Sequence, residues 1–364
     1  MLDWLTKLKV ASLTDHSFSP ASRFRIRQYI PILQNAGIDV EDFYRKLSTE
    51  TAAPRDSKKR IRHSAWLTIK ALAHESVNVI NRLSDTIKCN NADVVWLSRQ
   101  LIIGYPSFEF LVRKPLVYDI DDAIFLTGKL ANLQFKISAR KAVAIIAGNE
   151  FLADEASKYC NNITVIPTAV DTKRWKPITD RHADAAYNSD EFSIGWSGTS
   201  SSFKYFLPIE REIKQFLNDY PTATLSFMSD RFPTELKILG PNIKFVKWSV
   251  ERELEFIQLL DVGLMPIADD LWSRGKCAYK SLLYAACGIP IVITPTGVNQ
   301  KLLDQSDVGF GPKNPNEWYE VLRVLFYDRS IGKRLGNNGI RLIERDYSLN
   351  ACGPKIIEVL KSSS

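Results

Sequence analysis

Three basic residues lie close together where a predicted strand passes into a predicted helix. The segment DLWSRGKCAYK (270–280) places Arg274, Lys276 and Lys280 within seven residues. Helix N-termini bind anions through free N–H groups and the helix dipole, whereas cations there are unfavourable unless an anion is bound. The segment therefore predicts a diphosphate site, in which Gly275 allows the backbone to come close. The alternative is a solvated helix start.

A second segment also passes from a predicted strand into a predicted helix and carries a basic residue. The segment GWSGTSSSFK (195–204) leaves a predicted strand, turns at Gly198 and Thr199 through small hydroxyl residues, and enters a helix that contains Lys204. We expect a phosphate or sugar loop here, although many turns of Rossmann-like folds look similar. The fingerprint GxGxxG is absent from the chain, which argues against a nicotinamide or flavin dehydrogenase.

Acidic residues gather at the end of a predicted strand in the first half of the chain. The segment YDIDD (118–122) contains Asp119, Asp121 and Asp122. Clustered acids at a strand end are costly unless they bind cations, hydroxyls or a proton. We predict a functional role for the cluster as a whole, and the sequence does not single out one of the three aspartates. The alternative is that one of them caps the next helix.

Two other loops of the first half provide candidate ligand contacts besides Asp119. Ser22 and Arg23 lie in DHSFSPASR (15–23), which follows the first predicted strand. Asn149 lies where another apolar strand ends and a helix begins. Each loop follows a strand, and ligands of open α/β sheets bind beyond the carboxyl ends of strands.

The positive charge of the chain is concentrated in its first half. The net charge is +7, and residues 1–180 hold 26 Lys and Arg against 19 Asp and Glu, while 181–364 hold 22 of each. A local cluster, followed by Trp66, consists of Arg55, Lys58, Lys59, Arg60 and Arg62. The cluster is either a solvated loop or a patch for anionic lipid head groups or an acidic substrate. Because no RNP-like, helix-turn-helix or zinc-finger pattern accompanies it, we predict no nucleic-acid partner.

The elements that position these residues alternate between strands and helices. Strands that are apolar on both faces, separated by helices, indicate parallel sheets covered on both sides. The predicted strands are 8–13, 38–44, 92–98, 115–121, 142–149 and 163–170 in the first half and 192–198, 222–229, 242–248, 261–267 and 289–295 in the second. Helices are predicted over 22–37, 64–87, from Glu150, over 276–288 and through 315–361.

The pattern breaks once, in the polar segment 172–190, and this predicts two domains. We expect an α/β fold with two Rossmann-like, doubly wound parallel sheets that face a central cleft. The two domains would be residues 1–180 and 181–345.

Composition excludes several classes of protein. The chain has 364 residues, of which 45% are hydrophobic and 24% charged, so disorder, collagen and coiled coil are excluded. No apolar run approaches the ~20 residues of a membrane span. The first residues lack the apolar stretch of a signal peptide, and five cysteines occur without a CxxC pair. We expect a cytoplasmic protein with no metal site and no cofactor.

Several segments resemble the retaining glycosyltransferases of family four, which have the fold called GT-B. The first half is similar to a bacterial branch associated with surface polysaccharide assembly, through SPASRFRIRQYIPILQNAGI and VYDIDDAIF. The other segments that carry the resemblance are IPTAVDTKRWKP (166–177), IGWSGT (194–199) and the donor-site block DVGLMPIADDLWSRGKCAYKSLLYAACGIPIVITPTG (261–297). The resemblance covers nearly the whole chain.

The resemblance implies a nucleotide-sugar donor, bound by residues 181–345, and a glycan or lipid-linked saccharide acceptor, bound by residues 1–180. It implies that the helix 346–364 packs back on the first domain. In that case Asp121 or Asp122 would orient or deprotonate the acceptor hydroxyl, and the acceptor would be contacted by Ser22, Arg23, Asp119 and Asn149. The resemblance also implies retention of configuration. If the basic cluster binds an anionic membrane surface, the protein would lie on the inner face of the membrane. The family's two donor-block glutamates are replaced by Gly275 and Leu283, and the Arg of its Arg/Lys pair by Thr199. Donor contacts are then expected from Trp248, the backbone at Gly275 and Tyr279, and positive charge from Lys204 and the 274–280 segment.

Two other functions fit the same residues. A non-catalytic protein of this fold that binds a sugar nucleotide or glycan is compatible with the missing carboxylates. A nucleotide-sugar epimerase shares the fold and needs no separate acceptor. Transfer assays and product analysis without acceptor distinguish these alternatives from a glycosyltransferase.

Overall fold

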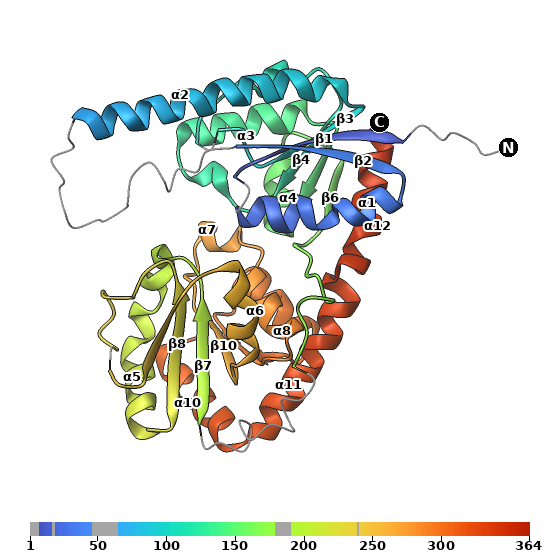
Figure 1. Cartoon of the computed structure of the whole chain (residues 1–364). Coiled ribbons are helices and arrows are strands. Elements are labelled where there is room, and N and C mark those ends of the chain that lie inside the picture. The colour runs from blue at the N-terminus through green and yellow to red at the C-terminus, as the bar shows by residue number, and fades with distance from the viewer. Residues whose placement is uncertain (1–6, 17–18, 46–64, 103, 179–190, 239) are drawn as a thin grey trace. The chain divides into compact units, whose positions relative to one another are not determined.

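A computed structural model describes residues 7–16, 19–45, 65–102, 104–178, 191–238 and 240–364 (Figure 1). For residues 65–75 the description is limited to the helical backbone. The basic cluster Arg55, Lys58, Lys59, Arg60 and Arg62 lies outside the described residues. The chain divides into two compact units, Met1–Thr168 with Cys352–Ser364, and Ala169–Ala351. The domain boundaries predicted from the sequence are at residues 180 and 345.

The first unit is built on a six-stranded parallel sheet, as the doubly apolar strands predict. The strand order is β2-β1-β3-β4-β5-β6. The chain therefore moves from β1 outward to β2 and then returns past β1 to β3. The strands are β1 (Leu8–Thr14), β2 (Ile38–Tyr44), β3 (Val94–Ser98), β4 (Leu116–Ile120), β5 (Ala144–Ala147) and β6 (Ile163–Val165).

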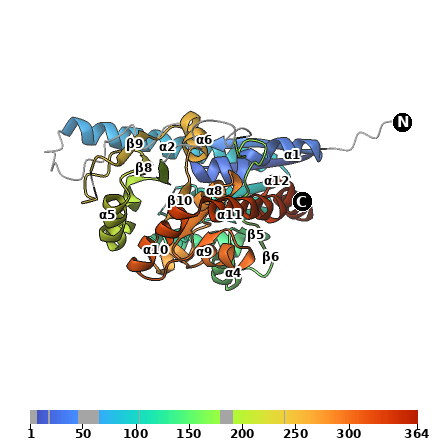
Figure 2. The same cartoon turned by 90° about the horizontal axis from the view of Figure 1, so that it is seen from below.

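Helices cover both faces of this sheet. They are α1 (Ile30–Asn35), α2 (Ala65–Lys88), α3 (Lys129–Lys141), α4 (Glu150–Ser157) and α12 (Leu349–Ser362). Helices α2 and α3 lie on one side of the sheet (Figure 1). On the other side, α1 and α12 are neighbours (Figure 2), and a Cβ at Gly353 would lie 3.3 Å from the Ile32 side chain. The chain thus returns to the first unit to complete one of its faces.

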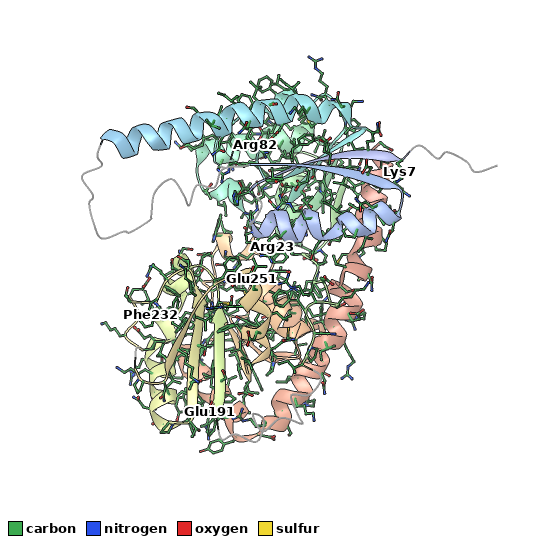
Figure 3. The ribbon with its side chains drawn as sticks, viewed as in Figure 1. Lys7, Arg23, Arg82, Glu191, Phe232 and Glu251 are labelled. Carbon is green, nitrogen blue, oxygen red and sulfur yellow. The ribbon has the colours of Figure 1, made fainter. Side chains whose placement is uncertain are left out.

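A buried arginine ties α2 to the first two strands. Arg82 turns toward the sheet (Figure 3) and donates hydrogen bonds to the carbonyl oxygens of Thr14 at 2.6 Å and Phe43 at 3.2 Å. Asp85 accepts a third at 3.1 Å. Burial lowers the pKa of Arg82, and the charge of Asp85 opposes this effect. The guanidinium thereby satisfies carbonyl groups at the carboxyl ends of β1 and β2.

The second unit repeats the architecture with a second six-stranded parallel sheet. Its strand order is β12-β11-β10-β7-β8-β9. The strands are β7 (Phe192–Ser197), β8 (Ala223–Ser229), β9 (Ile243–Lys247), β10 (Val262–Met265), β11 (Ile291–Ile293) and β12 (Gly309–Phe310). Its helices are α5 (Glu210–Asp219), α6 (Val250–Gln258), α7 (Leu271–Arg274), α8 (Tyr279–Ala286), α9 (Val298–Gln305), α10 (Pro315–Tyr327) and α11 (Arg329–Leu342).

Two apolar clusters form the core of this unit, one on each face of the sheet. Helices α6, α8 and α9 contribute to one cluster, which includes Phe256, Leu282 and Leu302. Helices α5 and α10 contribute to the other, which includes Phe216 and Leu322. Because the strands are buried on both faces, the sheet is a rigid base for the loops at its edges.

Some elements differ from the predictions. The helix expected over 276–288 begins only at Tyr279, after Ala278 adopts a left-handed conformation with φ of 51°. The tail expected to be helical through 315–361 is interrupted at Asp328 and Ser348, and β12 was not predicted. None of the helices in the described part of the chain is long and apolar enough to cross a membrane.

Candidate functional site

The strand order of the second unit indicates where a ligand would bind. The chain runs from β7 outward to β9 and then returns to β10 on the other side of β7. In open α/β sheets, ligands bind beyond the carboxyl ends of the strands at such a reversal. Gly198 directly follows β7, and the segment 266–280 follows β10. Both predicted phosphate segments therefore begin at the reversal.

Lys280 and Gly198 come together at this point. The Lys280 Nζ lies 4.6 Å from the centroid of the buried Trp196 ring. A Cβ atom built on Gly198 would lie 2.2 Å from that nitrogen and 2.6 Å from the ring. Any side chain at position 198 would therefore take the space of the ammonium group. The glycine is required for this packing, and the structure brings together two predicted donor residues that are far apart in sequence.

The surroundings of Lys280 disfavour the charged form of its amine. Burial and the nearby charge of Lys276 lower its pKa to about 7, and the charge of Glu253 opposes this effect. Among the residues that the structure describes, no hydrogen bond or ion pair to the Lys280 nitrogen is found. A cation that lacks a partner and is partly removed from water favours the binding of an anion.

The turn before α8 sets the direction of Lys276 and Lys280. Lys276 precedes the helix, and its Nζ lies 5.3 Å from the centroid of the Trp272 ring. Ala278 holds the left-handed conformation that β-carbon sterics disfavour by about 1–2 kcal/mol. Such strain is maintained only where the surroundings enforce it, and it often marks functional loops. Here it starts the helix immediately before Lys280.

Arg274 is held on the outer side of the same segment. Its Nε donates to an oxygen of Asp269 at 3.0 Å, and the same carboxylate accepts from the Thr296 hydroxyl at 2.7 Å. The hydrogen bond and charge of Arg274 hold the pKa of Asp269 below its usual value. Gly297 permits a close approach, since a Cβ there would lie 3.1 Å from the Arg274 Cα. The exposed arginine is therefore tied to a neighbouring loop.

The loop after Gly198 is organised by a carboxylate that the sequence did not reveal. Asp230, which follows β8, accepts hydrogen bonds from the Ser200 N–H at 2.6 Å and the Ser200 hydroxyl at 2.8 Å. Burial would raise the pKa of Asp230, but these hydrogen bonds hold it below its usual value. The hydroxyl of Thr199 pairs with that of Ser201 at 3.0 Å. Lys204 is exposed, and its Nζ lies 5.1 Å from the ring centroid of Tyr205.

The remaining donor candidates lie against the core of the second unit. Trp248 and Tyr279 are half-buried and pack on the cluster that includes α8. Gly275 is buried and ends α7. Leu283, at the place of a family glutamate, is a buried core residue. The buried Tyr284 beside it accepts a hydrogen bond from the Ser197 N–H at 2.9 Å and so fixes the end of β7.

In the first unit, Asp121 and Asp122 both bind one arginine. Arg99 follows β3 and has a left-handed backbone with φ of 62°. Its Nε lies 2.5 Å from Asp121, and its terminal nitrogen lies 3.0 Å from Asp121 and 2.5 Å from Asp122. Burial would raise the pKa of Asp121, but the charge and hydrogen bonds of Arg99 hold it below its usual value. Such a carboxylate is a weak base, so the pairing favours an orienting role over proton abstraction.

Three of the four predicted acceptor contacts are buried. Asp119 is 1% exposed, pairs with Arg25 at 2.8 Å and accepts from the Trp96 indole at 3.3 Å. Burial raises the pKa of Asp119 to about 6, and the charge of Arg25 opposes this effect. Ser22 is also buried, and the buried Asn149 caps α4 by accepting from the Leu152 N–H at 2.9 Å. The side chains of Asp119 and Asn149 support the fold, and the burial of all three argues against the predicted contacts.

Arg23 differs from those three residues. It is half-buried, and its guanidinium lies 4.6 Å from the centroid of the Phe24 ring (Figure 3). It therefore keeps part of its surface in contact with solvent, where an acceptor can reach it.

Two further observations bound the candidate site. Within the described ranges, no group of three or more His, Cys, Asp or Glu side chains could hold a metal ion. A hollow lined by Asp261, Pro290 and Arg329 lies at the amino ends of the strands of the second unit. Ligands of such sheets bind at the opposite edge, so this hollow is not part of the candidate site.

Four residues at the site were not predicted as functional: Trp196, Asp230, Glu253 and Tyr284. Trp196 lies inside the quoted segment GWSGTSSSFK, so its place beside Gly198 was a usable signal. Asp230 and Glu253 carry no local pattern that indicates a role. Their contribution depends on the pairing of β8 with β7 and on the packing of α6, which the sequence does not specify.

Solved structures match nearly the whole chain. One of them is HepE from Anabaena, which was solved with UDP and glucose and also with UDP-glucose. It is 15% identical, and the match covers 98% of this chain and 100% of HepE. The TM-score is 0.65 for the complex with UDP and glucose. The chain has the GT-B fold. This confirms the fold expected from the sequence, with two parallel sheets and their covering helices.

Two other structures with the GT-B fold are similarly close. Sucrose-phosphate synthase from Thermosynechococcus elongatus is 14% identical, with coverage of 98% of both chains and a TM-score of 0.68. WaaG, a glycosyltransferase involved in lipopolysaccharide biosynthesis, is 13% identical, with coverage of 97% and 99% and a TM-score of 0.65. No protein-family model matches the sequence. A search of curated proteins also finds no match.

Proposed function

We propose that this chain is a glycosyltransferase that moves a sugar from a nucleotide-sugar donor to a glycan or lipid-linked saccharide acceptor. The observation that carries the proposal is the position of the Lys280 ammonium. It lies between Trp196 and Gly198 at the strand reversal of the second unit, without a partner among the described residues. The GT-B fold supports this assignment, because the second unit of such a fold would bind the nucleotide-sugar donor at this edge.

The proposed chemistry is stabilisation of a leaving nucleoside diphosphate. As the bond from the sugar to the phosphate breaks, negative charge grows on a phosphate oxygen. Lys280, Lys276 and the N–H groups at the start of α8 are already fixed at the strand reversal, so they can stabilise that charge without reorganising. Loss of one such contact would remove roughly 2–4 kcal/mol of transition-state stabilisation. Lys204 and Arg274 remain candidates for the outer part of the site.

The finer features of the reaction are proposed as well. We propose that no metal is needed, because side-chain cations can balance the diphosphate charge. Retention of configuration follows only from the resemblance to family four. We propose that the first unit orients the acceptor through Asp121, Asp122 and Arg23. We propose a role in cell-surface glycoconjugate synthesis, because WaaG, which shares the fold, is involved in lipopolysaccharide biosynthesis. We also propose a location at the cytoplasmic face of the membrane.

A donor panel tests the proposal. Thermal-shift and transfer assays with UDP-, GDP-, ADP- and CMP-sugars should identify one nucleotide that stabilises the protein. In the double variant Lys276→Ala/Lys280→Ala, that shift and the transfer of sugar should both be lost. The control variant Lys214→Ala/Lys244→Ala removes two exposed lysines of the same unit and should keep both. A double variant with wild-type binding and turnover would refute the assignment of the site.

A non-catalytic binding protein is the second candidate. The places of the two family glutamates are taken by the buried Gly275 and Leu283, so no carboxylate occupies them. In that case, a nucleotide sugar would bind and would be neither hydrolysed nor transferred to any acceptor. Formation of an epimer without acceptor would instead identify an epimerase.

A further inference from the structure

Over residues 76–88, where its side chains are described, helix α2 buries polar residues and exposes apolar ones. The residues it buries include Asn78, Arg82 and Thr86, which lie one turn apart on one face. On the opposite face, Val77 is 45% exposed, Ile80 66% and Ile87 58%. A surface helix of a water-soluble protein normally buries its apolar stripe and exposes its polar one. The outer face of α2 therefore needs an apolar partner.

Helix α3 continues the same surface. Leu130, Leu133 and Ile137 follow one another at helical spacing and are 48%, 46% and 36% exposed. They lie opposite the residues that α3 buries against the sheet, such as Ala131 and Phe135. Helices α2 and α3 cover the same side of the sheet (Figure 1), and the side chains of both apolar stripes are exposed. The α2–α3 outer face is defined by Val77, Ile80, Ile87, Leu130, Leu133 and Ile137.

The charges beside this face are all of one sign on α3. The helix KLANLQFKISARK contains four cations, Lys129, Lys136, Arg140 and Lys141, and no acid. At 3.6 residues per turn, Lys129, Lys136 and Arg140 fall on the flank of the exposed stripe. No ion pair joins these cations to a carboxylate of the described residues. The stripe is therefore an apolar strip with a positive border.

We propose that the α2–α3 outer face docks on the surface of an anionic lipid bilayer. An amphipathic helix with leucines and isoleucines on one face and lysines and arginines beside them lies in the membrane interface. Each basic residue near an anionic surface contributes about 1 kcal/mol of attraction. A second copy of this chain would fit less well, because two such faces would bring like charges together. This surface would present the proposed enzyme to a lipid-linked acceptor.

Vesicle sedimentation tests the proposal on the full chain. Wild-type protein should bind vesicles of phosphatidylcholine mixed with phosphatidylglycerol and should bind pure phosphatidylcholine much more weakly. The variant Lys129→Gln/Lys136→Gln/Arg140→Gln should lose roughly 10- to 100-fold in affinity for the mixed vesicles. The variant Leu130→Ser/Leu133→Ser/Ile137→Ser should lose binding to a similar extent. Both variants should keep the donor-induced thermal shift of the wild type, which reports on the second unit separately.

Matched variants in the second unit control for general loss of charge or apolar surface. Lys214→Gln/Lys244→Gln/Lys313→Gln and Leu207→Ser/Leu259→Ser/Val324→Ser alter exposed residues there and should bind vesicles like the wild type. Unchanged binding in both α3 variants would overturn the proposal. So would binding lost only when Arg55, Lys58, Lys59, Arg60 and Arg62 are neutralised. A concentration-dependent dimer that the leucine variant abolishes would identify a second copy as the partner instead.

Discussion

Replacement of Lys280 by methionine should stabilise the protein at neutral pH while it abolishes donor binding. The pKa of Lys280 is lowered from 10.5 to about 7, so the folded state holds this proton less tightly than the unfolded state. Each unit of pKa corresponds to about 1.4 kcal/mol, so the protonated amine costs the folded state roughly 5 kcal/mol below pH 7. Methionine fills a similar volume without a charge and removes that cost.

The sign of the pH dependence follows from the same shift. Between pH 7 and pH 10.5 the unfolded chain binds the proton and the folded chain does not, so stability rises with pH. From pH 7 to pH 9 the wild type should gain about 2 kcal/mol in free energy of unfolding relative to Lys280→Met. Denaturant unfolding of both proteins, with Lys214→Met as an exposed-lysine control, measures this difference. A difference that does not vary with pH would refute the desolvated placement of the amine beside Gly198.

Two other predictions concern Gly198 in the second unit and Asp121 in the first. Gly198→Ala places a Cβ 2.2 Å from the Lys280 nitrogen and 2.6 Å from the Trp196 ring, so donor affinity measured by calorimetry should fall about tenfold or more. Gly240→Ala, whose Cβ would lie 3.9 Å from its nearest neighbour, should bind donor normally. Asp121→Asn weakens the pair with Arg99 and should lower the free energy of unfolding by about 1–3 kcal/mol. It should also reduce sugar transfer more than it reduces donor binding. Equal losses of transfer and donor binding would give Asp121 a purely structural role.

Periodicity in the sequence was sufficient to find the sheets because central strands such as β3 and β4 are apolar on both faces, whereas β2 alternates apolar and acidic residues. The range 38–44 is observed as predicted, and the runs around β3, β4, β7 and β8 differ only at their ends. The two-residue strand β12 was missed because two residues carry no period. The start of α8 was missed because the left-handed Ala278 is imposed by its surroundings, and alanine has no local preference for that conformation.

The candidate site was predictable in part. Gly198, Lys276 and Lys280 were recognisable because small residues and cations at a strand end have a direct chemical meaning. Asp119 was misinterpreted because the sequence cannot indicate that Arg25 and Trp96 would enclose it. Arg99 was missed for the same reason, since its partners Asp121 and Asp122 become neighbours only through the pairing of β3 with β4.

The leucine at position 283 and the lowered pKa of Lys280 have a common explanation. Leu283 lies three residues after Lys280 on α8, and side chains at that spacing are neighbours on a helix. A glutamate at 283 would pair with Lys280, raise its pKa and compete with a phosphate for its charge. The buried leucine instead leaves Glu253 as the carboxylate whose charge acts on the amine, and that charge does not prevent a pKa of about 7. If the proposed function holds, Lys280 gains a proton and a partner together when a diphosphate binds, and a cation takes the electrostatic role at this point of the fold.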